Sequence, residues 1–193
     1  MAGLLKDKQL FSFYNQSYFK ARGRWFPWTK AFFFASWIKL FCRPRTLLDV
    51  GCARGELVFC SRFLGIKAFG IDISPDALRQ VPRAVKNFCY HGSITALNFK
   101  KNSFDFITAL ALLEHIPHHN LGQALRELER VALKGLVLQI CVPDSPWERN
   151  RHYLRDPTHV NIRPSSWWQK VFQQRYWRFR EIFPRSGLFL IKF

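Results

Sequence analysis

The sequence has few of the features that mark metal-binding, disulfide-linked or membrane-spanning proteins. Its five cysteines are an odd number, scattered, with no C-x-x-C pair and no histidines at metal-ligand spacing: Cys42, Cys52, Cys60, Cys89 and Cys141. We therefore expect reduced thiols in a cytoplasmic protein and no bound metal. The most apolar N-terminal run, residues 31–42, is too short to span a bilayer and contains Lys39. We expect this run to pack against the protein or to rest on a membrane surface.

Acidic residues are scarce at both ends of the chain. Residues 1–46 carry nine Lys or Arg against one acid, and residues 145–193 carry ten against three. Residues 47–144 are nearly balanced, with eleven against nine, so the net charge of +17 lies mainly on the two flanks. This pattern favours a neutral core that holds a small ligand, with flanks that contact an anionic partner such as RNA or a membrane surface. A basic surface that serves only solubility explains the charge equally well.

Two phosphate-binding motifs are also absent from the glycine loop at residues 51–55. The sequence "LLDVGCARGE" has neither G-x-G-x-x-G nor a P-loop ending in Gly-Lys-Ser/Thr; its spacing is G-x-x-x-G, with Asp49 before it and Glu56 after it. Acids here would repel a pyrophosphate but suit a ligand with an amino group. Asp72 follows Gly51 by 21 residues, the separation at which an acid binds ribose hydroxyls. S-adenosylmethionine, with its ribose, sulfonium and ammonium groups, is the predicted cofactor.

Apolar runs alternate with amphipathic stretches along the chain. Buried strands are expected at residues 45–50, 66–73, 86–92, 104–109, 134–143 and 186–193. Helices are expected at residues 55–65, from the Ser74 cap onward, at 120–133, and from a cap at Ser165 or Ser166, the last being followed by another strand. Strands that are apolar throughout and alternate with helices predict a parallel sheet covered on both faces.

Four segments in order, "LLDVGCARGE", "GIDIS", "NSFDFITALALLEHI" and "VLQICVPD", resemble a class I S-adenosylmethionine-dependent methyltransferase of the type 11 or type 23 groups. The resemblance covers roughly residues 18–144 and extends to "DPTHVN" at 156–161. It implies an α/β, Rossmann-like, doubly wound fold with a mostly parallel seven-stranded sheet and helices on both faces.

The resemblance also implies which residues bind the cofactor. Loop residues would line its methionine part, the acid of the second strand its ribose, and later residues its adenine and sulfonium. The residues concerned are Asp49, Gly51, Cys52, Ala53, Gly55, Asp72, Ile73, Ser93, Ile94, Ala109 and Leu110. Ala53 stands where the family usually has glycine, which we expect to be tolerated if its backbone torsions are ordinary.

Histidines are the candidates for a general base, which a hydroxyl or a weakly acidic carbon acceptor would need. His159 in "DPTHVNIRP" is the first candidate and His152 the reserve. A structural role for His159 is an equally good interpretation, and for His115 in "LLEHIP" it is the favoured one.

The flanks are expected to select the substrate. Residues 1–44 are interpreted as a basic, aromatic helical segment or lid, from which Tyr18 and Arg22 would reach the cofactor. Residues 45–193 would form the methyltransferase domain, with a cofactor-binding core at 45–144 and a substrate-side segment at 145–193. We expect a small-molecule, glycan or lipid-like methyl acceptor. The alternatives are an RNA methyltransferase that uses the basic flanks, or a non-catalytic cofactor-binding or scaffold protein.

Overall fold

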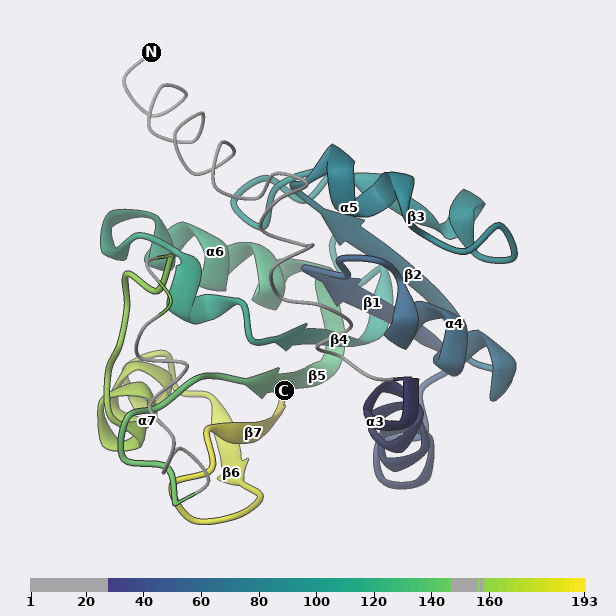
Figure 1. Cartoon of the computed structure of the whole chain (residues 1–193). Helices are drawn as coiled ribbons and strands as arrows, with labels where there is room; N and C mark the ends of the chain where they lie inside the picture. Colours follow the sequence, from purple (N-terminus) through teal and green to yellow (C-terminus); the bar gives the residue numbers. More distant parts are fainter. Residues whose placement is uncertain (1–27, 147–155, 157) are drawn as a thin grey trace. The chain divides into compact units, whose positions relative to one another are not determined.

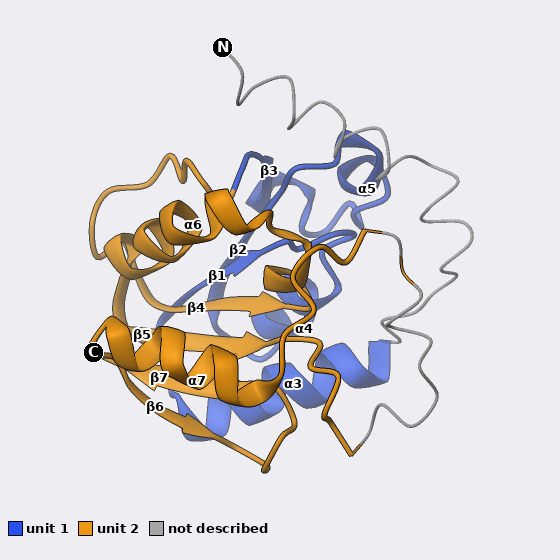
Figure 2. Ribbon diagram, turned by 90° about the vertical axis from the view of Figure 1, so that its left-hand side faces the viewer, with its two compact units in different colours: residues 1–93 blue, residues 94–193 orange. Residues whose placement is uncertain are grey.

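The computed structural model describes residues 28–146, 156 and 158–193 (Figure 1). Tyr18, Arg22 and His152, three of the predicted site residues, lie outside the described residues. The chain divides into two compact units, residues 1–93 and residues 94–193 (Figure 2).

The first unit contains three parallel strands in the order β3-β2-β1. Its elements in chain order are α3 (Trp28–Phe41), β1 (Thr46–Val50), α4 (Glu56–Phe63), β2 (Lys67–Asp72), α5 (Pro75–Arg79), a 3-10 turn (Lys86–Phe88) and β3 (Cys89–His91). The predicted cap of α5 is confirmed, because the Ser74 hydroxyl accepts a hydrogen bond from the Ala77 amide at 3.2 Å. Within α3, four residues are buried: Ala31, Phe34, Ala35 and Ile38.

The second unit contains four strands in the order β4-β5-β7-β6. Its elements are β4 (Phe104–Leu110), a 3-10 turn (Leu113–His115), α6 (His118–Val131), β5 (Ala132–Gln139), α7 (Ser165–Gln174), β6 (Arg178–Glu181) and β7 (Leu188–Lys192). β4 and β5 are parallel, whereas β7 runs antiparallel to both β5 and β6. The seven strands of the two units make up the predicted Rossmann-like, mixed and mostly parallel sheet.

An aromatic cluster fills the core of the second unit between α7 and the antiparallel strands. The ring of Phe172 lies 5.6 Å from that of Trp177 and 5.2 Å from that of Phe189, measured between centroids. Trp168 is completely buried next to them, so its side chain belongs to the core of this unit.

The predicted serine cap of α7 is wrong. Pro164 occupies the N-cap position without a side-chain bond, and Ser165 is the first helical residue. The Ser165 hydroxyl instead donates to the Glu181 carboxylate at 2.8 Å, and the Ser165 amide donates to Asp144 at 2.9 Å. Asp144 therefore satisfies one of the backbone amides at the start of the helix, which have no partner within it.

Candidate functional site

The glycine loop of the first unit connects the carboxyl end of β1 to α4 and is tied to β2 by its backbone. The amides of Gly51 and Cys52 both donate to the carbonyl of Ile71, at 2.8 and 3.1 Å. Gly51 and Gly55 have positive φ angles of 79° and 72°, a conformation that glycine adopts without steric cost. The loop therefore folds back over the end of β2, as the glycine spacing predicts.

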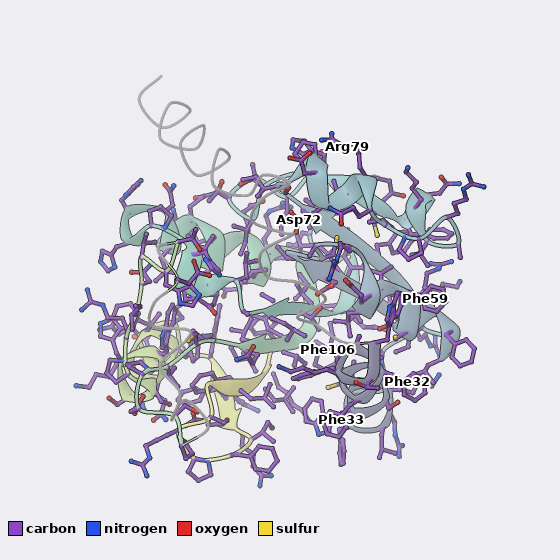
Figure 3. All side chains as sticks on the ribbon, viewed as in Figure 1. Phe32, Phe33, Phe59, Asp72, Arg79 and Phe106 are labelled. Atoms are coloured by element: carbon purple, nitrogen blue, oxygen red, sulfur yellow. The ribbon has the colours of Figure 1, made fainter. Side chains whose placement is uncertain are left out.

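Asp72 is the centre of this site and lies at the carboxyl end of β2 (Figure 3). Its Oδ2 accepts the Ala53 amide at 2.7 Å and its Oδ1 accepts the Ser74 amide at 2.8 Å. One carboxylate thus joins the β1–α4 loop to the start of α5. A carboxylate has about four acceptor positions, so each oxygen keeps the capacity to accept one ribose hydroxyl. Burial raises the pKa of Asp72, and the bonds from Ser74 and Ala53 oppose this rise.

Ala53 does not have the ordinary torsions that we expected. Its φ angle is 46°, in the left-handed region that L-residues with a Cβ avoid. The hydrogen bond from its amide to Asp72 holds this conformation. The alanine is therefore accommodated at the cost of local backbone strain, which the usual glycine would not carry.

The acids on either side of the loop have different surroundings. Glu56, at the start of α4, accepts the Arg54 guanidinium at 3.0 Å. Asp49 is 5% exposed near the end of β1. Glu56 is thus paired with a cation, whereas Asp49 is a buried acid of the strand that leads into the loop.

Cys52 is a packing residue of the loop. A hydrogen bond with the Cys89 thiol and burial raise its pKa well above the ordinary value, and the Asp49 and Asp72 carboxylates add to the rise. The thiol therefore stays neutral at physiological pH, which argues against a nucleophilic role. A Cβ on Gly70 would lie 2.7 Å from its sulfur, so only glycine fits beside Cys52 on β2.

His91 is a site residue that the sequence interpretation missed. It is in register with Asp72 where β2 and β3 pair, and its Nε2 lies 3.1 Å from the carbonyl of Ile73. Its charge also favours the ionised form of Asp72. The sequence could have indicated His91, because the last residues of neighbouring parallel strands lie at the same end of a sheet.

The predicted cofactor residues belong to both units. In the first unit, the loop residues, Asp72 and Ile73 lie at the carboxyl ends of β1 and β2, and Ser93 follows β3. In the second unit, Ile94 and Ala109 are buried, and Leu110 ends β4. The chain then turns at Ala111, which has a φ angle of 51° and donates its amide to Gln139 at 2.7 Å.

A buried polar cluster in the second unit contains Glu114, His115 and His159. One potential ligand atom from each lies within 4.8 Å of the others, and all three residues are at most 9% exposed. The two histidine rings are 4.5 Å apart between centroids. His115 Nδ1 lies 3.2 Å from the carbonyl of Thr158 and 3.0 Å from its hydroxyl. The favoured structural role of His115 agrees with these contacts.

Glu114 organises the chain on both sides of this cluster. Its carboxylate accepts the Cys141 amide at 3.2 Å, and its carbonyl accepts the amides of Val160 and Asn161, both at 2.9 Å. Asn161 in turn donates to the Ile116 carbonyl. The turn after β4 and the segment at 158–161 are thereby held together.

The chemistry of the cluster suits two uses. Two imidazoles and a carboxylate are ligands that zinc accepts, so these side chains could hold a metal that we did not expect from the sequence. Alternatively, His159 could accept a proton, and its Nε2 lies 3.9 Å from the Asp156 carboxylate. Sequence spacing gave no sign of the cluster because 44 residues separate His115 from His159.

Part of this chain is similar to known methyltransferases. Residues 48–138 match the family model described as "Methyltransferase domain". A ubiquinone biosynthesis O-methyltransferase of Glaesserella parasuis is 33% identical over 96 residues, which are 44% of this chain and 40% of that protein. The uncharacterized methyltransferase YcgJ of Bacillus subtilis is 24% identical over 155 residues, covering 73% and 60%. This chain spans between 36% and 60% of the length of the curated relatives compared.

Solved structures share the fold. Magnesium protoporphyrin IX methyltransferase from Synechocystis PCC 6803, with bound SAH, aligns with a TM-score of 0.71 at 15% identity, covering 96% of this chain and 97% of that one. A possible histamine N-methyltransferase from Thermotoga maritima aligns with a TM-score of 0.65 at 17% identity, covering 88% and 92%. Within the described residues, no helix is both long and apolar enough to cross a bilayer.

Proposed function

We propose that this chain, which carries a class I methyltransferase domain at residues 48–138, transfers the methyl group of S-adenosylmethionine to a small or lipid-like acceptor. The observation that carries the proposal is the Asp72 carboxylate, which is buried at the carboxyl end of β2 and bonded to the glycine loop. This is where open α/β sheets bind the ribose of a nucleoside.

The residues of the first unit fit the cofactor part by part. Asp72 would accept the two ribose hydroxyls, and Ile73 would pack against adenine. Asp49 would attract the ammonium group, while the backbone of Gly51 would approach the methionine chain. When bound, S-adenosylmethionine supplies an activated methyl group, so the chain's main task is to align an acceptor with it.

The acceptor class is inferred from the apolar character of the second unit and from the relatives. Ala109 and Leu110 end β4, and Leu113 is completely buried after it. Similar proteins include a ubiquinone biosynthesis O-methyltransferase and a trans-aconitate 2-methyltransferase. A small organic acceptor is therefore favoured. RNA is the second candidate, and the observation in its favour is the positive charge of the flanks. His159 is the proposed general base for an acceptor that must lose a proton.

Calorimetric titration of the protein with S-adenosylmethionine and S-adenosylhomocysteine tests the proposal. Binding of both, followed by methyl transfer in a screen of radiolabelled small acceptors, is the expected result. With an acceptor in hand, His159→Gln should lower turnover while leaving cofactor affinity unchanged. A folded protein that binds neither compound would refute the methyltransferase function. Transfer to RNA alone, weakening steeply with salt, would favour the second candidate.

Cofactor affinity should depend on pH through Asp72. The ionised carboxylate accepts the ribose hydroxyls, so protonation competes with binding, and burial raises the pKa at which this begins. We expect affinity for S-adenosylhomocysteine to fall as the pH is lowered through that pKa, approaching about tenfold per pH unit below it. Calorimetry at a series of acidic pH values measures this. Asp72→Asn should bind weakly with little pH dependence; the same acidic decline in this variant would assign the titration to another group.

A further inference from the structure

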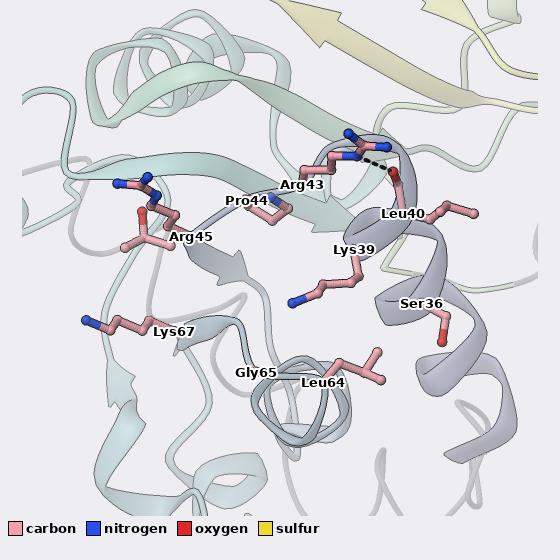
Figure 4. Close-up of a pocket in the computed structure, with 10 residues that line it drawn as sticks. Ser36, Lys39, Leu40, Arg43, Pro44, Arg45, Leu64, Gly65 and Lys67 are labelled. Carbon is pink, nitrogen blue, oxygen red and sulfur yellow. Dashed lines mark hydrogen bonds between the residues drawn. The ribbon is translucent and has the colours of Figure 1, made fainter.

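A groove in the first unit lies at the amino ends of β1 and β2, and four basic side chains line it: Lys39, Arg43, Arg45 and Lys67 (Figure 4). Lys39 comes from α3, Arg43 and Arg45 from the connection to β1, and Lys67 from the first position of β2. All four residues are exposed. None of the residues that line the groove is acidic. The groove therefore presents a concentrated positive charge, which suits an anionic partner.

Large apolar side chains are exposed on α3 and α4, the helix that contributes to this groove and the helix that ends next to it. Leu40 lines the groove and is 61% exposed, and Phe33, one helical heptad before it on α3, is 66% exposed. Phe32, also on α3 (Figure 3), is 44% exposed. Phe63 at the end of α4 is 74% exposed, and its ring lies 6.4 Å from that of Phe32. Phe32, Phe33, Leu40 and Phe63 together form what we call the apolar rim.

We propose that the basic groove and the apolar rim form a docking surface for a membrane that contains anionic phospholipids. Cations would contact lipid phosphates, while the rim would enter the boundary between headgroups and acyl chains. A free phosphate would use the cations but leave the rim in water. RNA would use aromatic rings for stacking but gains nothing from Leu40. The combination of charge and apolar surface therefore favours a lipid surface.

The position of this surface is compatible with cofactor binding. The groove and Asp72 lie at opposite ends of the parallel strands. The groove is at the amino ends of β1 and β2, whereas Asp72 is at the carboxyl end of β2. A membrane bound at the groove would therefore leave the Asp72 end of the strands open. The inference goes beyond the proposed function and does not depend on it, because lipid binding requires neither cofactor nor turnover.

Cosedimentation of the full chain with vesicles tests the docking surface. We expect binding to phosphatidylcholine vesicles containing about 30% phosphatidylserine and much weaker binding to phosphatidylcholine alone. Lys39→Gln combined with Lys67→Gln should weaken binding about 25-fold, at about fivefold per cation near an anionic surface. Phe33→Ser combined with Leu40→Ser should weaken it at least about tenfold, because two apolar side chains no longer enter the interface.

A matched control separates the groove from net charge. Arg83→Gln combined with Lys86→Gln removes the same charge from two exposed residues outside the groove and should change binding less than about threefold, since the lipid contacts stay intact. Circular dichroism and thermal unfolding verify that each variant is folded. The proposal is overturned if the control weakens binding as much as the groove variant. It is also overturned if the folded groove variant loses affinity for single-stranded RNA but not vesicles, or if the rim variant converts a dimer to a monomer without affecting vesicle binding.

Discussion

Asp72→Ala should reduce affinity for S-adenosylmethionine at least about 100-fold. A hydrogen bond to a charged group contributes about 1.5–3 kcal/mol, and the variant loses the proposed acceptor of both ribose hydroxyls. It also releases the amides of Ala53 and Ser74, which the carboxylate holds at 2.7 and 2.8 Å. Titration calorimetry of parent and variant measures the difference.

Two further variants make this result specific. Asp76→Ala removes an acid four residues later, which pairs with Arg79 on the surface of α5, and should change affinity less than about twofold because surface ion pairs contribute little. Asp72→Asn keeps one acceptor for the loop amides, so it distinguishes lost ribose contacts from a collapsed loop when its thermal unfolding matches that of the parent. Tight binding by a folded Asp72→Ala protein would place the nucleoside elsewhere.

Gly135→Ala should destabilise the protein strongly, lowering the free energy of unfolding by about 3 kcal/mol or more. Gly135 lies in β5, between β4 and β7 in the second unit. A Cβ at this position would be 2.0 Å from the carbonyl oxygen of Ile191 and 3.0 Å from Cε1 of Phe106. The carbonyl belongs to the backbone of a paired strand and cannot rotate away, so β7 would have to separate from β5. Urea unfolding followed by circular dichroism measures the loss.

Gly122→Ala is the matched control for this substitution. Gly122 lies within α6, and its added Cβ would meet only the Arg126 side chain, at an ordinary 3.6 Å. Alanine in a helix interior is favoured over glycine by about 0.5–1 kcal/mol, so this variant should be slightly more stable than the parent. If Gly135→Ala unfolds at the same urea concentration as the parent, β5 and β7 do not pair in the register described.

Local sequence patterns predicted most of the strands and helices, because apolar spacing and capping residues act within a few positions of each element. The mostly apolar segment at residues 104–109 predicted β4, and serine followed by proline predicted the start of α5. The boundaries were less accurate where long-range contacts decide them. β5 begins at Ala132 rather than Lys134, because the apolar spacing of the preceding helix continues through Leu133, which in the structure is an exposed strand residue. Likewise, the Ser165 hydroxyl contacts Glu181, a partner 16 residues away that no local motif indicates.

In the candidate site, too, the features set by local spacing were predictable and those set by long-range contacts were not. The glycine loop and Asp72 were predictable because their spacing encodes a strand, a turn, a helix and a second strand. The torsion of Ala53 was not, because the carboxylate that holds it lies 19 residues later. The association of Glu114, His115 and His159 was equally hidden, since only tertiary packing brings His159 to the turn after β4.

The junction between α6 and β5 limits how this chain can change in length. The helix ends at Val131 and the strand starts at Ala132, so no spare residue separates them. Side chains alternate between the two faces of a strand, and one inserted residue would move every following side chain of β5 to the opposite face. The register that sets Gly135 against β7 would be lost at the same time. Insertions and deletions should therefore be far more harmful at this junction than in the loop at residues 98–103, where the chain has no such pairing to preserve.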